Sequence, residues 1–224
     1  MSTRRIRVPQ LPVDGPVDVP MDKQHHLKVV LRLHPGAQVL AFDGLARQCA
    51  CTIGAHADGR WFLDPAGPVQ TVEVGPETRL LLGLTKPKAL HMALRMSVEV
   101  GITHIDVIAL QRSQNRPPRL DRWQKIMEAA AQQCGRSDVP ALQHHDRLTD
   151  ALTTVHVPLF VAVPGAERPE RPTLGGAVLI GPEGGLTESE IDMALSSGAQ
   201  RLGLGRWVLR ADTAAVLGSH FIAG

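Results

Sequence analysis

Two glycine-rich turns near the C-terminus are the segments best suited to bind a ligand. The first lies in LIGPEGGLTESEI at 179–191, where Gly181–Gly185 separate the aliphatic run 177–180 from a predicted helix. Thr187 followed by Glu190 fits a capping box, so this helix should begin directly after Thr187. Glycine lets a ligand approach the backbone closely, and N–H groups at a strand-to-helix turn point outward. A tight structural turn is the alternative interpretation.

Two familiar nucleotide-binding patterns fail on spacing. A P-loop needs Gly-Lys-Ser/Thr, whereas Gly184-Gly185 is followed by Leu186-Thr187. A dinucleotide fingerprint needs a third glycine, which GLGRWV at 203–208 lacks. Ser-His-Asp and Cys-His signatures are absent, and the histidine pairs lack partners at zinc spacing, so we expect no metal. What remains is a pocket of backbone amides and carbonyls, suited to an uncharged base and a short polar chain.

Alternating strands and helices must position these turns. From about residue 79 the pattern predicts strands at 79–84, 103–109, 159–163, 177–180 and 201–204, and helices at 89–100, 120–134, 188–197 and from about 212. This alternation is typical of a mostly parallel α/β sheet covered on both faces. Ligands in such sheets bind beyond the carboxyl ends of the strands. Gly181–Gly185, Gly203–Gly205 and the loop after Val163 fall at such ends, which predicts one pocket.

The first part of the chain follows a different pattern. Strand-like pieces, QVLAFDG, QCACTIGAH, RWFLD and QTVEVG, are separated by turn residues at the spacing of a small barrel. A helix-like segment, DKQHHLKVVLRL at 22–33, interrupts them. We therefore expect two domains, at 1–72 and 73–224, with the boundary within 67–76.

Composition is ordinary for a globular protein. The formal net charge of +2 over 224 residues is too small to indicate a nucleic-acid binder by itself. No apolar stretch is long enough to span a bilayer, the N-terminus lacks the apolar part of a signal peptide, and three cysteines are an odd number. These features favour the cytoplasm. One local cluster of Arg112, Arg116, Arg119, Arg122 and Lys125, offset nearby only by Asp121, suits either an anion or a solvated helix face.

Several segments together resemble one known family. LIGPEGGLTESEI followed by LGLGRWVLRADTAA resembles the paired C-terminal motifs of the RsmE family, the bacterial 16S rRNA uridine-N3 methyltransferases of the SPOUT superfamily. HHLKVVLRLHPGAQVLAFDG at 25–44 is similar to that family's PUA-like RNA-binding domain. MSVEVGI at 96–102 and RWQKIMEAAAQQCGR at 122–136 resemble two of its helices. The resemblance covers nearly the whole chain in the right order.

The resemblance implies a SPOUT trefoil-knot methyltransferase domain at 73–224 and a small N-terminal PUA-like β-barrel at 1–72. It implies methylation of a uridine N3 in 16S rRNA by a homodimer with its active sites at the subunit interface. Because the N-terminal domain is small and only slightly basic, we expect it to read folded shape and phosphates, which favours the assembled 30S subunit as the substrate. S-adenosylmethionine is the implied cofactor. The implied cofactor-binding residues are Val163, Pro164, Leu179, Ile180, Gly181, Pro182, Glu183, Gly184, Gly185, Leu202, Leu204, Gly205, Val208, Leu209, Arg210, Thr213 and Ala214.

Arg210 and Glu183 are the candidate catalytic residues. Uridine N3 carries a weakly acidic proton, so either a base or a cation that stabilises the developing uracil anion assists transfer. Arg210 suits the second role, and a salt bridge to Asp212 or Glu183 is its alternative. Glu183 suits orientation of the cofactor or proton removal, and capping of a neighbouring helix is its alternative. Asp212 stands where the family has Glu.

Arg4, Arg7, His26, Arg32 and Arg112 are the candidate RNA-binding residues, since cationic side chains position RNA through its phosphates. Simple packing or an ordinary surface position is the alternative for His26. Two other functions stay open: a knotted methyltransferase for another RNA nucleotide, and a non-catalytic RNA-binding or ribosome-assembly protein.

Overall fold

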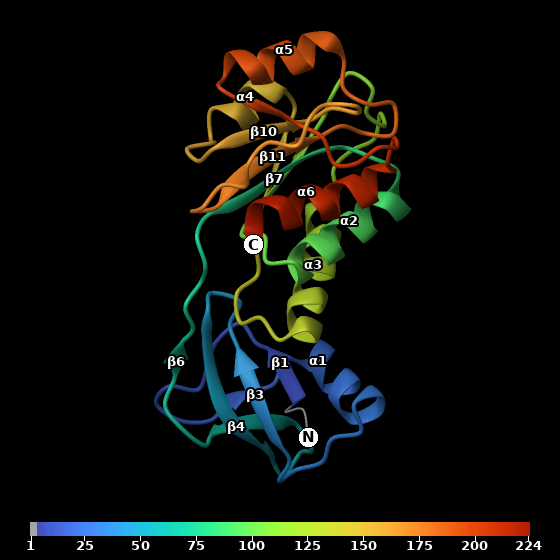
Figure 1. Cartoon of the computed structure of the whole chain (residues 1–224). Coiled ribbons are helices and arrows are strands. Elements are labelled where there is room, and N and C mark those ends of the chain that lie inside the picture. The colour runs from blue at the N-terminus through green and yellow to red at the C-terminus, as the bar shows by residue number, and fades with distance from the viewer. Residues whose placement is uncertain (1–3) are drawn as a thin grey trace. The chain divides into compact units, whose positions relative to one another are not determined.

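The computed structural model describes residues 4–224, apart from the side chains of Asp22 and His26. The chain forms two compact units (Figure 1). Unit 1 holds the described residues up to Val74 together with Ala131–Val139, and unit 2 holds Gly75–Ala130 and Pro140–Gly224. The sequence pattern did not anticipate that residues 131–139 join the first unit.

Unit 1 is built on a six-stranded mixed sheet in the order β1-β3-β4-β5-β2, with β6 paired to β4. Strand β1 runs parallel to β3, whereas the pairs from β3 to β4, β4 to β5 and β5 to β2 are antiparallel. Among the described residues, no pairing joins the edge strands β1 and β2. The strands are β1 (Arg4–Arg7), β2 (Val17–Asp18), β3 (Gln38–Phe42), β4 (Arg47–Ala55), β5 (Trp61–Pro65) and β6 (Gln70–Thr71).

Alternation along β4 explains the core of unit 1. Cys49, Cys51 and Ile53 are buried on one face, because successive side chains of a strand point to opposite sides. All three cysteines of the chain are free. The helix expected over 22–33 is shorter and consists of α1 (Met21–His25) followed by a π-helical turn, η1 (His26–Val30). Strands β1 and β2 were not predicted, since each is short and lies at an edge of the sheet.

Unit 2 contains six parallel strands in the order β12-β10-β11-β7-β8-β9. The central strands β7 and β11 are buried along their whole length, as expected for a parallel sheet covered on both faces. The predicted α/β architecture is therefore confirmed. The strands are β7 (Thr78–Gly83), β8 (His104–Ile108), β9 (Ala141–His145), β10 (Leu159–Ala162), β11 (Gly176–Ile180) and β12 (Gln200–Leu202).

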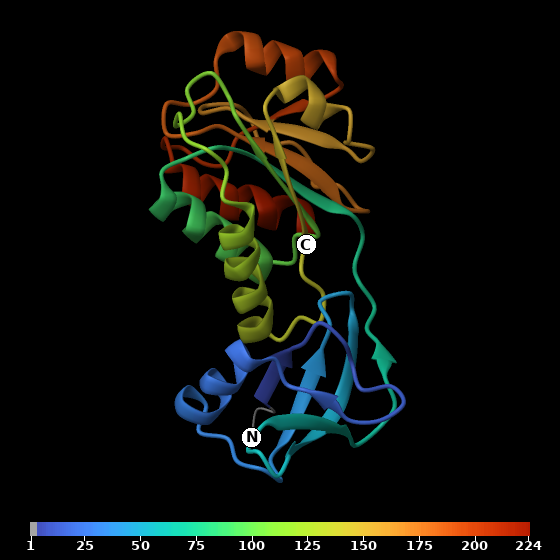
Figure 2. The same cartoon turned by 180° about the vertical axis from the view of Figure 1, so that it is seen from behind.

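Helices cover both faces of this sheet. Figures 1 and 2 show α4 and α5 on one face and α2 and α6 on the other. The helices are α2 (Pro87–Glu99), α3 (Leu120–Cys134), α4 (Leu148–Leu152), α5 (Glu188–Ser196) and α6 (Ala211–Ala223). The capping box predicted at the start of α5 is confirmed, because the Thr187 hydroxyl accepts the Glu190 N–H and the Glu190 carboxylate accepts the Thr187 N–H. Strand β9 and the five-residue α4 were not predicted.

A charged network lies inside unit 2. The guanidinium of Arg79 donates to one carboxylate oxygen of Asp106 at 2.9 Å, and Nε2 of His145 lies 2.7 Å from the other. The side chains of Asp106 and Arg79 are only 2% and 9% exposed. Since the carboxylate has partners on both oxygens, this network ties β7, β8 and β9 together.

Asp106→Ala should lower the free energy of unfolding by about 3 kcal/mol, the lower end of the cost of breaking a buried ion pair, because Arg79 keeps only its partly exposed partner Glu77 at 3.3 Å. Urea denaturation followed by circular dichroism measures this loss. Glu99→Ala is the matched control, since Glu99 pairs with Arg95 at 3.6 Å on the surface of α2 and such pairs contribute about 1 kcal/mol or less. Equal, small losses in both variants would contradict the role given to Asp106.

Candidate functional site: a glycine-lined pocket at the strand ends

The loops that follow β10, β11 and β12 line one pocket in unit 2, with a volume of about 810 Å³. It lies beyond the carboxyl ends of these strands, where the pattern predicted a site. Of the predicted cofactor-binding residues, all except Leu179 and Thr213 line it. Leu179 is buried within the sheet and Thr213 is exposed on α6.

Seven further residues line the pocket, and the sequence pattern did not predict them as cofactor contacts: Arg112, Ala162, Leu186, Glu188, Ile191, Trp207 and Ala211. Most are neighbours in sequence of predicted ones, so widening each predicted loop would have found them. Arg112 is different, because it follows β8 and was predicted to contact RNA. Only the folded chain brings it to the glycine loop after β11.

Close backbone contacts require glycine at two positions, Gly203 against the loop after β10 and Gly181 against Leu186 of its own loop. The Gly203 N–H donates to the Glu167 carbonyl at 2.8 Å, and a Cβ added at Gly203 would lie 1.9 Å from the Ala166 carbonyl oxygen. A Cβ at Gly181 would lie 2.9 Å from the Leu186 nitrogen. For these two residues the structural-turn interpretation accounts for the glycine.

Gly205 differs from them. A Cβ added there would meet nothing within 4 Å, although the residue lines the pocket. Its φ of 156° is one that residues with a side chain rarely adopt, so the backbone conformation accounts for this glycine, and the space beside its Cα is open.

Glu183 and Arg112 support the walls of the pocket. Glu183 Oε1 accepts the backbone N–H of Lys86 at 3.0 Å, and Lys86 directly precedes α2. The helix that Glu183 caps is thus α2, and its carboxylate faces the positive end of that helix. Arg112 Nη1 donates to the carbonyls of Gly184 at 3.0 Å and Leu186 at 3.3 Å, which holds the glycine loop in place.

Arg210 lines the pocket from the residue directly before α6. Within residues 4–224, no ion pair joins its guanidinium to Asp212 or Glu183, which are the partners that a structural role requires. Asp212 instead accepts the N–H of Thr213 at 3.0 Å. An exposed guanidinium at the mouth of the site is available to an incoming group.

The predicted RNA-binding residues are divided between the units. Arg4 and Arg32 are exposed in unit 1, while the backbone N–H of Arg7 donates to Gln132 Oε1 at 3.3 Å. The side chain of His26 lies outside the described residues. Contact of these side chains with phosphate stays a prediction.

Two absences bear on the kind of site. In the part of the chain that the structure describes, no three His, Cys, Asp or Glu side chains gather as metal ligands would. No helix among the same residues is long and apolar enough to cross a membrane.

An all-parallel sheet with a glycine-lined pocket beyond its strand ends defines unit 2 as a ligand-binding α/β domain of the doubly covered kind. The model of the RNA methyltransferase domain matches residues 73–222, and the chain belongs to that family.

Relatives and solved structures extend this likeness to nearly the whole chain. The ribosomal RNA small subunit methyltransferase E of Synechocystis is 28% identical over 96% of this chain and 75% of its own. The Neisseria gonorrhoeae enzyme of the same name, solved with S-adenosyl methionine, has a TM-score of 0.86, 27% identity, and coverage of 97% of this chain and 95% of its own. A Legionella pneumophila protein, solved with its bound cofactor SAM, has a TM-score of 0.85, 26% identity, and coverage of 98% and 96%. The resemblance to the RsmE family is thereby confirmed.

Gly203→Ala should lower the free energy of unfolding by about 1 to 3 kcal/mol, because the added methyl group must push two backbone segments apart. Chemical denaturation measures the change. Gly75→Ala is the control in the same unit, since a Cβ there meets nothing within 4 Å. A Gly203→Ala protein as stable as the control would show that the close approach is not needed for folding.

Proposed function

We propose that the protein transfers a methyl group from S-adenosylmethionine to N3 of a uridine in the small-subunit rRNA of the assembled 30S particle. The observation that carries this proposal is the pocket beyond β10, β11 and β12. It is lined by the same glycine motifs that resemble the RsmE family, and two similar structures hold this cofactor. Ribosomal particles assemble in the cytoplasm, so we place the activity there.

The residues present fit S-adenosylmethionine. A volume of about 810 Å³ lies within the range of small-molecule sites. Ile180, Leu202 and Leu209 supply apolar walls for a base, and Gly205 leaves room at the backbone. Glu183 and Glu188 are carboxylates suited to face a positively charged group, whereas Arg210 suits the electron-rich ring of the acceptor base. When bound, the cofactor supplies an activated methyl group on a cationic sulfur.

Methyl transfer is an in-line displacement, so the protein contributes mainly by positioning and by its electric field. Arg210 is our candidate for stabilising negative charge on the uracil ring after N3 loses its proton. Glu183 already accepts a hydrogen bond from Lys86, which supports a role in orientation more than in proton removal. A preorganised guanidinium contributes most where charge develops in the transition state.

The proposal also includes a trefoil knot, a methyltransferase domain and an RNA-binding domain. The Gly203 contact with the Ala166–Glu167 backbone supports a trefoil knot formed by the loops after β10 and β12. The family match begins at residue 73, which supports a methyltransferase domain at 73–224. The N-terminal sequence resemblance and the β-rich unit 1 support a PUA-like RNA-binding domain at 1–72.

A homodimer is also part of the proposal. Trp207 and Val208, in the loop before α6, are 72% and 82% exposed, and Leu217 on α6 is 39% exposed. Large apolar side chains exposed in neighbouring segments are typical of a surface that another protein covers. A second copy of the chain is the partner that the resemblance implies.

Arg210→Ala should slow single-turnover methyl transfer at saturating cofactor by on the order of a hundredfold, since one preorganised charge partner is lost in the transition state. Arg210→Lys should recover only part of the rate, because an ammonium lacks the planar guanidinium. Calorimetry should find S-adenosylmethionine affinity close to that of the unchanged protein.

Arg201→Ala is the matched control for Arg210 and should leave the rate unchanged, since Arg201 is an exposed arginine of β12 that does not line the pocket. A near-normal rate in Arg210→Ala, or a loss fully explained by a lower melting temperature, would assign Arg210 to the scaffold. A protein that does not bind S-adenosylmethionine at all would refute the proposed function.

Leu217→Glu should convert a dimer into monomers, because a carboxylate would have to be desolvated at the interface. Light scattering measures the mass, which should fall to that of one 24.2 kDa chain. Val29→Glu in unit 1 introduces the same charge at another exposed apolar position and should leave the dimer intact. A monomer before any substitution, with activity retained, contradicts the homodimer.

A further inference from the structure

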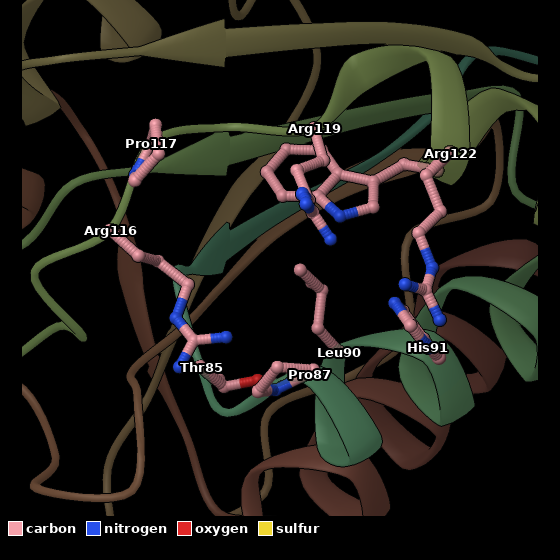
Figure 3. Close-up of a pocket in the computed structure, with 9 residues that line it drawn as sticks. Thr85, Pro87, Leu90, His91, Arg116, Pro117, Arg119 and Arg122 are labelled. Atoms are coloured by element: carbon pink, nitrogen blue, oxygen red, sulfur yellow. The ribbon is translucent and has the colours of Figure 1, made fainter.

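A second pocket in unit 2, of about 280 Å³, lies at the start of α2 and α3. We call it the arginine pocket; its lining residues are Thr85, Pro87, Leu90, His91, Arg116, Pro117, Arg119, Arg122 and Trp123. Figure 3 shows Leu90 pointing from α2 toward the middle of the pocket, with Arg116 on one side and Arg122 beside His91 on the other. Leu90 and Trp123 are only 2% and 3% exposed, so the floor is apolar and firmly packed.

Three guanidinium groups surround this floor without a carboxylate among them. In the part of the chain that the structure describes, no ion pair joins Arg116, Arg119 or Arg122 to an acidic side chain, and Asp121 is not among the lining residues. Like charges gathered at a hollow with low-dielectric walls create a strong positive field. The solvated-face interpretation of this arginine cluster does not explain why three of its members converge on one hollow.

His91 adds a polar but uncharged group. Burial, together with the positive charge of Arg122, lowers the pKa of His91 below its ordinary value. The imidazole is therefore neutral near pH 7 in the free protein, and it offers a hydrogen bond without adding a fourth charge.

The arginine pocket adjoins the glycine-lined pocket. Thr85 and Pro87 line the first, and Lys86 between them donates its N–H to Glu183, which lines the second, at 3.0 Å. The Gln114 N–H donates to the Leu84 carbonyl at 3.1 Å, which holds the loop carrying Arg116 against the same segment. The segments that line the two pockets are therefore in direct contact.

We propose that the arginine pocket binds a phosphodiester of the acceptor RNA, with the adjoining sugar or base against the exposed rings of Pro87 and Pro117, while the methylated base enters the glycine-lined pocket. This rests on the proposed function for its choice of RNA. Guanidinium groups bind phosphate oxygens through paired hydrogen bonds, and single-stranded RNA presents both a charged backbone and flat apolar faces. An acidic peptide would match the charges but leave the exposed proline rings without a flat partner. Arg116, Arg119 and Arg122 are thus RNA-positioning residues.

The test substitutes the three arginines one at a time and together: Arg116→Gln, Arg119→Gln, Arg122→Gln and the triple variant. Lys125→Gln is the matched control, because Lys125 is an exposed cation on the same helix, α3, and does not line the pocket. Filter binding to small-subunit rRNA is measured across a series of KCl concentrations. Calorimetry with S-adenosylmethionine and a melting curve accompany each variant.

The triple variant should bind the rRNA on the order of a hundredfold more weakly, and the slope of log affinity against log salt should shrink by about 0.7 for each phosphate that the protein no longer neutralises. Each single variant should show part of both effects. In single-turnover transfer, the RNA concentration for half-maximal rate should rise while the saturating rate changes little, because the arginines position the RNA without touching the reacting atoms. Cofactor affinity should be unchanged.

Unchanged RNA affinity and salt slope in the single and triple variants would overturn the proposal, and so would an equal loss in Lys125→Gln. If the triple variant fails to fold, the single variants decide. Failure of the unchanged protein to bind S-adenosylmethionine would refute the proposed function instead, and the RNA-binding comparison would still stand.

Discussion

The close passage of two backbone segments at Gly203 is the constraint on which the glycine-lined pocket depends. The loop after β12 passes so near the Ala166 carbonyl that no side chain fits between them, and the Gly203 N–H donates to the Glu167 carbonyl across this approach. Because of this approach, the loop after β10 and the loop after β12 form one wall. Farther along, the chain reaches Arg210 and the first turn of α6, so the same constraint sets where the candidate catalytic group lies.

The other wall of the pocket, formed by the loop after β11, is held by side chains from elsewhere in unit 2. Arg112 binds two of its carbonyls, and Glu190 accepts the backbone N–H of Gln111 at 2.8 Å as well as capping α5. Glu183 fastens the same loop to the start of α2. A loop rich in glycine would otherwise lose much conformational entropy on folding, and these contacts offset that cost.

The arginine side chains of unit 2 differ in what they contact. Arg79 is buried and pairs with both Asp106 and Glu77, so its charge stabilises the fold. Arg112 donates to two carbonyl oxygens of the loop after β11 and so holds that loop in place. Arg116, Arg119, Arg122 and Arg210 have no such partner among the described residues, and all four line pockets. Guanidinium groups that line pockets without a neighbouring carboxylate are suited to bind a polyanionic substrate. Such a local cluster creates a positive field even though the net charge of the whole chain is only +2.

Short stretches of the sequence were enough to predict many of the strands and helices and most of the pocket lining. Aliphatic runs such as 177–180 predicted the buried parallel strands, and Thr187 with Glu190 predicted the start of α5, because these signals act over a few residues. The glycine motifs located most of the pocket lining. The short β1, β2 and β9 were missed, since such segments are stabilised by pairing with strands distant in sequence rather than by their own pattern. Only the tertiary structure decided that Arg112 braces the glycine loop, that Glu183 caps α2, and that three arginines converge on Leu90, because each depends on contacts between segments that are far apart along the chain.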